Sequence, residues 1–99
     1  MIKDNFEKYL EYAKNTRAAF AGYDDVRDSG LTMPGNVERF CDIRYGGDEK
    51  WNLLDIYYPS EVSSPNKTIV SVHGGAYVYG DKERYRFYCA DLAGRGFTV

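Results

Sequence analysis

The chain has 99 residues, of which 43% are hydrophobic and 28% charged, a composition typical of one small globular domain. Its formal charge of −2 and its scattered basic residues argue against nucleic acid as a partner. No apolar run approaches the about 20 residues of a membrane span, and the first residues lack the apolar core of a signal peptide. We therefore expect a cytoplasmic protein without a membrane partner.

The two cysteines, Cys41 and Cys89, lie far apart in the sequence and lack C-x-x-C spacing. We expect two buried thiols in a reducing compartment, with a disulfide or a metal pair as the alternative. No other cluster indicates a metal, and we expect no cofactor.

Residues 4–21 predict a helix, because apolar side chains recur near helical spacing, and Gly22 suits its C-terminal cap. The residues on that apolar side are Phe6, Tyr9, Leu10, Ala13 and Phe20. The polar stretch 23–36 is interpreted as a connection.

Two strands are expected next. Residues 37–45 alternate in hydrophobicity, residues 51–58 are rich in aromatics, and a Gly-Gly-Asp turn separates them. This pattern predicts an antiparallel hairpin whose second strand stops at Pro59. The alternation places on one side of the first strand Val37, Cys41, Ile43 and Tyr45.

The β-branched run 68–72 predicts a strand buried on both faces, as in a parallel sheet. Asp81 can cap a helix over 82–93, and residues 97–99 begin another strand. The helical spacing predicts a buried face made of Tyr85, Tyr88, Cys89 and Leu92. A strand, helix and strand in this order imply a right-handed crossover and the α/β class.

A His-Gly-Gly sequence joins this strand to the helix, and three interpretations of it compete. As an oxyanion hole, Gly74 and Gly75 would let backbone N–H groups approach a substrate oxygen closely. As a phosphate loop, Gly75 and Gly80 have the required spacing, but Asp81 and Lys82 stand where Lys and Ser or Thr are needed. In the third interpretation, the glycines only make a tight turn.

The segment His73–Tyr77, followed by Gly80 and a Tyr/Phe-rich helix, resembles the α/β-hydrolase esterases related to hormone-sensitive lipase. In that family an HGG motif ends the third strand. Leu54–Pro59 is similar to the family's D-x-Y-x-P pattern, and Gly96–Val99 to the entry of its fourth strand. The resemblance covers about residues 37–99.

The resemblance implies an incomplete α/β-hydrolase fold, in which residues 1–99 form the N-terminal portion of a single domain. Residues 37–99 would begin the core sheet. Residues 1–36 would form the helix and connection, and the helix could belong to a cap.

The resemblance also implies roles around the loop. Gly74 would make the turn, and Gly75 and Ala76 would donate the N–H groups of the oxyanion hole, Ala76 standing where many relatives have a third glycine. His73 would orient the loop instead of acting as the triad base. Two aromatic residues, Tyr77 and Tyr79, would lie near the substrate pocket or, alternatively, simply pack under the loop.

The triad itself is missing from this sequence. None of its serines lies in G-x-S-x-G, and His73 is the only histidine. We therefore expect the N-terminal part of a serine carboxylic-ester hydrolase that acts on small esters, with no catalytic residue in this chain and no turnover by it alone. The alternatives are a non-catalytic ligand-binding module and a self-associating module.

The expected sheet also predicts a partner. The run 68–72 would lack a neighbour on one edge, and the helix 82–93 would cover only one face. We expect a homo-oligomer joined through this exposed sheet, or a second polypeptide that supplies the C-terminal half.

Overall fold

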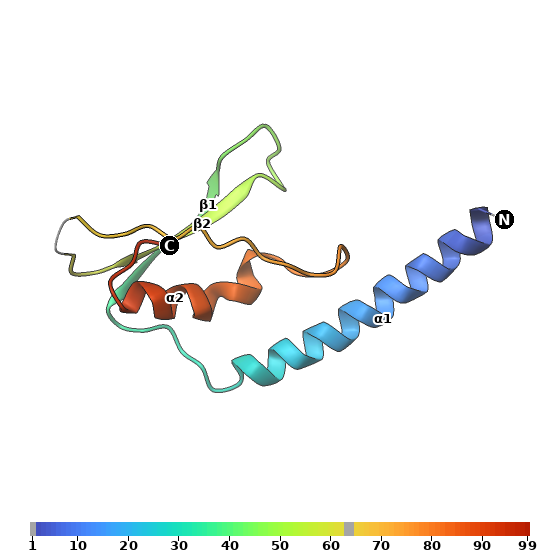
Figure 1. Cartoon of the computed structure of the whole chain (residues 1–99), viewed down its shortest axis with the longest axis horizontal. Helices are drawn as coiled ribbons and strands as arrows, with labels where there is room; N and C mark the ends of the chain where they lie inside the picture. The colour runs from blue at the N-terminus through green and yellow to red at the C-terminus, as the bar shows by residue number, and fades with distance from the viewer. Residues whose placement is uncertain (1, 63–64) are drawn as a thin grey trace.

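The computed structural model describes residues 2–62 and 65–99 (Figure 1). Its elements are the helix α1 (Ile2–Asp28), the strands β1 (Val37–Arg44) and β2 (Leu53–Pro59), the 3-10 helix η1 (Lys82–Tyr85) and the helix α2 (Arg86–Gly94). The helix α2 lies against the sheet, whereas α1 extends away from it (Figure 1). The radius of gyration of 17.0 Å reflects this extension, since a compact chain of this length would have about 13 Å.

The first helix is longer than predicted, and the expected end at residue 21 is wrong. It runs through Gly22 to Asp28, although a glycine inside a helix costs about 1 kcal/mol relative to alanine. An ion pair between Asp24 and Arg27, 3.2 Å apart, supports the added turns. Gly30, with φ of +79°, then provides the left-handed conformation that commonly follows a helix end.

The predicted antiparallel hairpin is confirmed, with Val37 opposite Pro59. The second strand begins at Leu53, two residues later than expected, and Pro59 is its last residue. A β-bulge between Phe40 and Ile43 interrupts the register. Because a bulge adds a residue to one strand, it breaks the alternation that the sequence predicts beyond Phe40.

The bulge changes the environment of the first cysteine. Asp42, inside the bulge, has φ of +60°, and its neighbour Cys41 is exposed. Cys89 is buried, and both thiols are free. The prediction of two buried thiols is therefore correct for Cys89 and wrong for Cys41.

Two further segments extend the sheet beside β2. Val99 exchanges two backbone hydrogen bonds with Tyr57 (2.8 and 2.9 Å), which is an antiparallel pattern. Thr98 forms a parallel bridge with Thr68. The order across the sheet is thus β1, β2, residues 97–99 and the segment around Thr68, with η1 and α2 between the last two in sequence.

The prediction that residues 68–72 form a strand buried on both faces is wrong for this structure. Val70 and Val72 are 83% and 85% exposed. Among the described residues, nothing pairs with the backbone beyond Ile69 or covers these two side chains. The segment then leads into residues 73–80, which we call the HGG loop.

The core is small and lies between β2 and α2. Its buried residues are Tyr57, Cys89, Ala90 and Ala93. The predicted buried face of the helix is therefore only partly right, because Tyr88 is 59% exposed. The helix starts as a 3-10 turn with three residues per turn, which shifts the buried face. The two alanines also let α2 approach the sheet closely.

The opposite side of the sheet carries no helix among the described residues. Tyr57 points toward α2, so its neighbours on β2 point away. Thr98 also points away, because the adjacent Val99 packs against the core. Thr68 pairs with Thr98 and shares its face. Because side chains alternate along an extended segment, Val70 and Val72 lie on the same face as Thr68. This surface, which we call the bare sheet face, comprises Phe40, Ile56, Tyr58, Val70 and Val72.

Candidate oxyanion loop and the charged cluster beside it

The HGG loop reverses the chain through an unusual turn. The Gly75 carbonyl accepts hydrogen bonds from the N–H groups of Val78 (3.1 Å) and Tyr79 (2.9 Å). Ala76 and Tyr77 both have positive φ, 51° and 66°, as in a type I′ turn. Left-handed backbone at such residues costs about 1–3 kcal/mol each and persists only where the surroundings impose it.

Two glycines are required for this path. At Gly75, with φ of +157°, a Cβ atom would overlap the carbonyl oxygen of Tyr79. At Gly80, with φ of +101°, it would lie 2.5 Å from the carbonyl oxygen of Gly74. Gly74 itself has open space around it. The requirement for glycine therefore falls on Gly75 and Gly80, whereas Gly74 was expected to make the turn.

The amides expected to form the oxyanion hole are available. The N–H groups of Gly75 and Ala76 make no hydrogen bond to any residue that the structure describes. Ala76 is exposed and Gly75 is half-buried. Two free N–H groups on adjacent residues are the chemical means by which such a loop could stabilise a negatively charged oxygen.

His73 lies at the entrance of the loop. Its Nδ1 atom is 3.0 Å from the carbonyl oxygen of Gly74 and donates to it in the matching tautomer. Its ring stacks on Tyr85, with the centroids 6.3 Å apart. The imidazole is thus held between the Gly74 carbonyl of the loop and the ring of Tyr85 in η1.

The two tyrosines of the loop lie in different surroundings. Tyr77 is fully exposed. The ring of Tyr79 packs edge-on against Phe20 of α1, with 5.5 Å between centroids, and its hydroxyl donates to the Asp24 carboxylate. Burial and this hydrogen bond raise the pKa of Tyr79 to about 12. Arg17 of α1 donates to the carbonyl of Val78, so α1 holds the outer side of the loop.

A cluster of charged side chains lies just after the loop; we call it the Asp55 cluster. Its members are Arg39, Asp42, Asp55, Lys82 and Glu83. The Asp55 side chain is only 2% exposed. It accepts hydrogen bonds from Lys82 Nζ (2.8 Å), Arg39 Nη2 (3.0 Å) and the N–H of Asp42 (2.9 Å). Burial alone would raise the pKa of Asp55, but these donors outweigh it and hold the pKa below its usual value.

Sequence reasoning missed this cluster. Asp55 appeared only as one letter of the D-x-Y-x-P pattern, and Lys82 only as a mismatch to a phosphate loop. A usable signal was present, because Asp55 alternates with the buried residues Tyr57 and Pro59 and so points to the covered side of β2. A carboxylate at such a position needs cationic partners from elsewhere in the chain.

Acid should weaken the Asp55 cluster. Because the pKa of Asp55 is lowered by folding, its stabilising contribution is complete above the ordinary value near 3.8 and is lost as the pH falls through the folded value. Lys82, whose pKa is raised, stays charged throughout. We expect Asp55→Asn to cost about 3 kcal/mol at neutral pH, since it removes the buried carboxylate that both Lys82 and Arg39 contact, and to flatten the acid limb of the stability curve.

Urea unfolding from neutral to strongly acid pH measures both effects. Asp91→Asn is the matched control, because Asp91 forms only an exposed ion pair with Arg95. An unchanged acid limb in Asp55→Asn would contradict the prediction.

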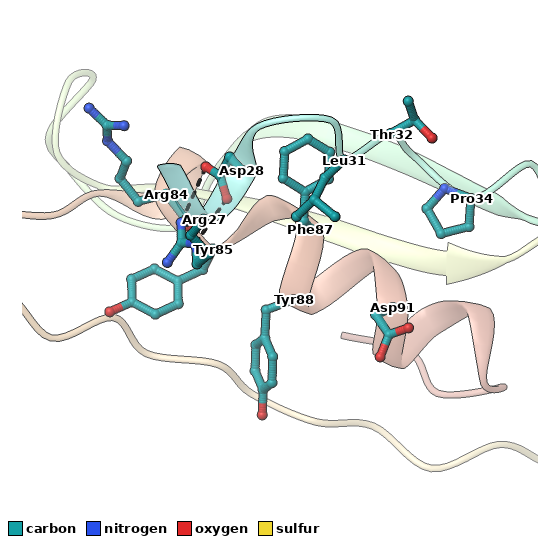
Figure 2. A pocket seen from close by; sticks show the side chains of 10 residues that line it. All are labelled: Arg27, Asp28, Leu31, Thr32, Pro34, Arg84, Tyr85, Phe87, Tyr88 and Asp91. Atoms are coloured by element: carbon teal, nitrogen blue, oxygen red, sulfur yellow. Dashed lines mark hydrogen bonds and ion pairs between the residues drawn. The ribbon is translucent and has the colours of Figure 1, made fainter. Parts of the chain in front are cut away.

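A cavity of about 540 Å³ lies apart from the HGG loop, between the end of α1 and the helices η1 and α2 (Figure 2). Its aromatic walls include Tyr85, Phe87 and Tyr88, and Arg27 and Arg84 lie at one end (Figure 2). Both cations are already paired with aspartates of α1. No residue of the HGG loop lines this cavity.

Across residues 2–62 and 65–99, no three His, Cys, Asp or Glu side chains are grouped so that they could hold a metal ion. In the same part of the chain, no helix is both long enough and apolar enough to cross a membrane.

The helix, the antiparallel hairpin and the small helix match part of an esterase fold. The chain is similar to esterase B from Lactobacillus rhamnosis, with 28% identity and a TM-score of 0.85 over 97% of this chain. The form inhibited by a tributyrin phosphonate gives 29% identity and a TM-score of 0.82 over 94%. This chain spans only about 31% of the length of esterase B. No family model and no curated protein matches the sequence.

Proposed function

We propose that this chain is the oxyanion-loop portion of a serine carboxylic-ester hydrolase of the α/β-hydrolase type related to hormone-sensitive lipase. The observation that carries the proposal is the pair of amides at Gly75 and Ala76, which bond to none of the residues that the structure describes and are presented by a left-handed turn after an extended segment. The likeness to esterase B, including its phosphonate-inhibited form, supports the same reaction class.

In the proposed reaction, a serine oxygen attacks the ester carbonyl carbon, and a base takes the serine proton. The amides of Gly75 and Ala76 donate hydrogen bonds to the oxygen that becomes negative, and one such donor is worth about 10²–10³ in rate. The alcohol leaves with the proton, and water then releases the acid from the acyl-serine. Serine, acid and base come from residues that this sequence does not contain, while His73 orients the loop.

The proposal predicts that the 99-residue chain alone hydrolyses no ester. A hybrid, in which residues 1–99 replace the matched part of esterase B, should hydrolyse tributyrin and react covalently with a phosphonate. A chromogenic ester assay and intact-mass measurement of phosphonate labelling test both statements.

His73→Ala is the control for slow attack by the imidazole in the isolated chain. Covalent labelling of a serine in the 99-residue chain would contradict the proposed division of the site. A folded hybrid that neither hydrolyses nor labels would contradict the function.

We also propose that this chain self-associates, because the bare sheet face is apolar and open. Phe40 is 52% exposed, Tyr58 37%, and Val70 and Val72 more than 80%. Sheets in α/β proteins are normally covered on both sides. The open backbone after Ile69 can pair with the same segment of a second copy about a two-fold axis. A polypeptide that carries the rest of an esterase fold is the competing occupant.

A further inference from the structure

The two ends of the HGG loop are fixed by different means. The incoming end continues from the bridge between Thr68 and Thr98. The outgoing end passes Gly80 and reaches Lys82, the first residue of η1. Lys82 Nζ lies 2.8 Å from the Asp55 carboxylate of β2 and 2.7 Å from the Asp42 carboxylate of β1. One side chain thus ties the end of the loop to both strands of the hairpin.

We propose that Lys82 is a positioning residue, which holds the amides of Gly75 and Ala76 in place through its ion pairs with Asp55 and Asp42. The proposal rests on the proposed function and adds to it the contacts that fix the positions of the two oxyanion-hole amides. Lys82 itself touches no reacting atom.

The mechanical link from Lys82 to the amides is short. Gly80 lies two residues before Lys82, and its Cα is packed so closely that a Cβ would lie 2.5 Å from the Gly74 carbonyl oxygen and 3.1 Å from Nδ1 of His73. Tyr79 in turn lies directly against Gly75. A shift of Lys82 therefore moves Gly80 against the segment that presents the amides.

The β-bulge serves the same contact. It places Asp42 at a φ of +60°, which is unusual outside glycine. In this conformation the Asp42 N–H donates to Asp55 at 2.9 Å, while the Asp42 carboxylate pairs with Lys82. Asp42 thus contacts both members of the Lys82–Asp55 ion pair, one through its N–H and the other through its carboxylate. This double contact explains why the hairpin departs from regular pairing at this point.

The test uses the 99-residue chain and Lys82→Met, which keeps the length of the side chain but removes its charge. We expect the NMR amide signals of Gly75 and Ala76 to shift. The coupling constants that report positive φ at Ala76 and Tyr77 should change to values averaged over several backbone conformations. Slow hydrogen exchange at the α2 core should remain. Lys82→Arg should restore the wild-type signals.

In the esterase B hybrid, Lys82→Met should lower kcat by up to about 10²-fold with KM nearly unchanged, the pattern of a misplaced catalytic geometry. Arg95→Met is the matched control, because it removes an exposed ion pair at the far end of α2. It should leave both readouts as they are.

Unchanged amide signals in Lys82→Met would overturn the inference. If Lys82→Met does not fold, the Asp42→Asn variant tests the inference instead. Asp42 is largely exposed, and removing its charge leaves Asp55 paired with Lys82 and Arg39. This variant should move the same signals by a smaller amount, and an absence of movement would again overturn the inference. An inactive wild-type hybrid would refute the proposed function alone, because the amide readout does not depend on it.

Discussion

Gly75→Ala should remove the geometry of the HGG loop and reduce turnover of the esterase B hybrid by at least about 10²-fold, the loss seen when one oxyanion donor is removed. The new Cβ would overlap the Tyr79 carbonyl oxygen, so the backbone at 75 must move. The same movement breaks the hydrogen bonds from Val78 and Tyr79 to the Gly75 carbonyl. In the isolated chain we expect a loss of about 2 kcal/mol in the free energy of unfolding.

Gly74→Ala provides a matched control one residue away. Its Cβ meets no atom within 4 Å, and the position has no left-handed φ. We expect turnover within a few-fold of the unmodified hybrid and little change in the urea midpoint. Equal losses of turnover in Gly74→Ala and Gly75→Ala would contradict the prediction. They would show that the space around Gly74 and the clash at Gly75 make no difference to the loop.

Val72→Lys should convert a self-associated chain into a monomer. A valine buried in an interface contributes about 1.5 kcal/mol, and a two-fold dimer contains each position twice. The expected loss of about 3 kcal/mol corresponds to about 10²-fold in the dissociation constant. Sedimentation equilibrium at micromolar concentration measures it.

Val26→Lys is the matched control, because Val26 is 77% exposed on α1, away from the bare sheet face. It should not change the association. A wild-type chain that is monomeric and cooperatively folded would contradict self-association. Dissociation of a homodimer on addition of the unmatched part of esterase B would instead favour the competing occupant.

The first helix, the hairpin and the later helix were predictable because they depend on local patterns. The aromatic run of β2, the Gly-Gly-Asp turn and the cap at Asp81, whose side chain accepts from the Arg84 N–H, are all short-range features. The errors arise from tertiary contacts. The added turns of α1 beyond Gly22 are held by Tyr79 and η1, which are more than 50 residues away. The exposure of Val72 depends on whether another segment covers its face of the sheet, and the hydrophobic pattern of residues 68–72 does not contain that information.

The contacts that hold the HGG loop were not predictable from the sequence. The His-Gly-Gly motif predicts an oxyanion hole, which stays a prediction. The positive φ of Ala76 and Tyr77 had no signal in the sequence, because neither residue favours that conformation. The Asp55 cluster joins residues 39 to 83, and only the folded backbone brings these charges together.

The pairing of Val99 with Tyr57 has a consequence for the order of folding. Residues 97–99 lie between β2 and the segment around Thr68, so that segment can reach its place only after the chain has passed through α2 and returned. The hairpin can form early, since its strands are close in sequence, whereas the bridge from Thr68 to Thr98 must close a loop of 29 intervening residues. On a ribosome, the loop-bearing segment would therefore have to wait for residues 97–99 to be made before it could join the sheet.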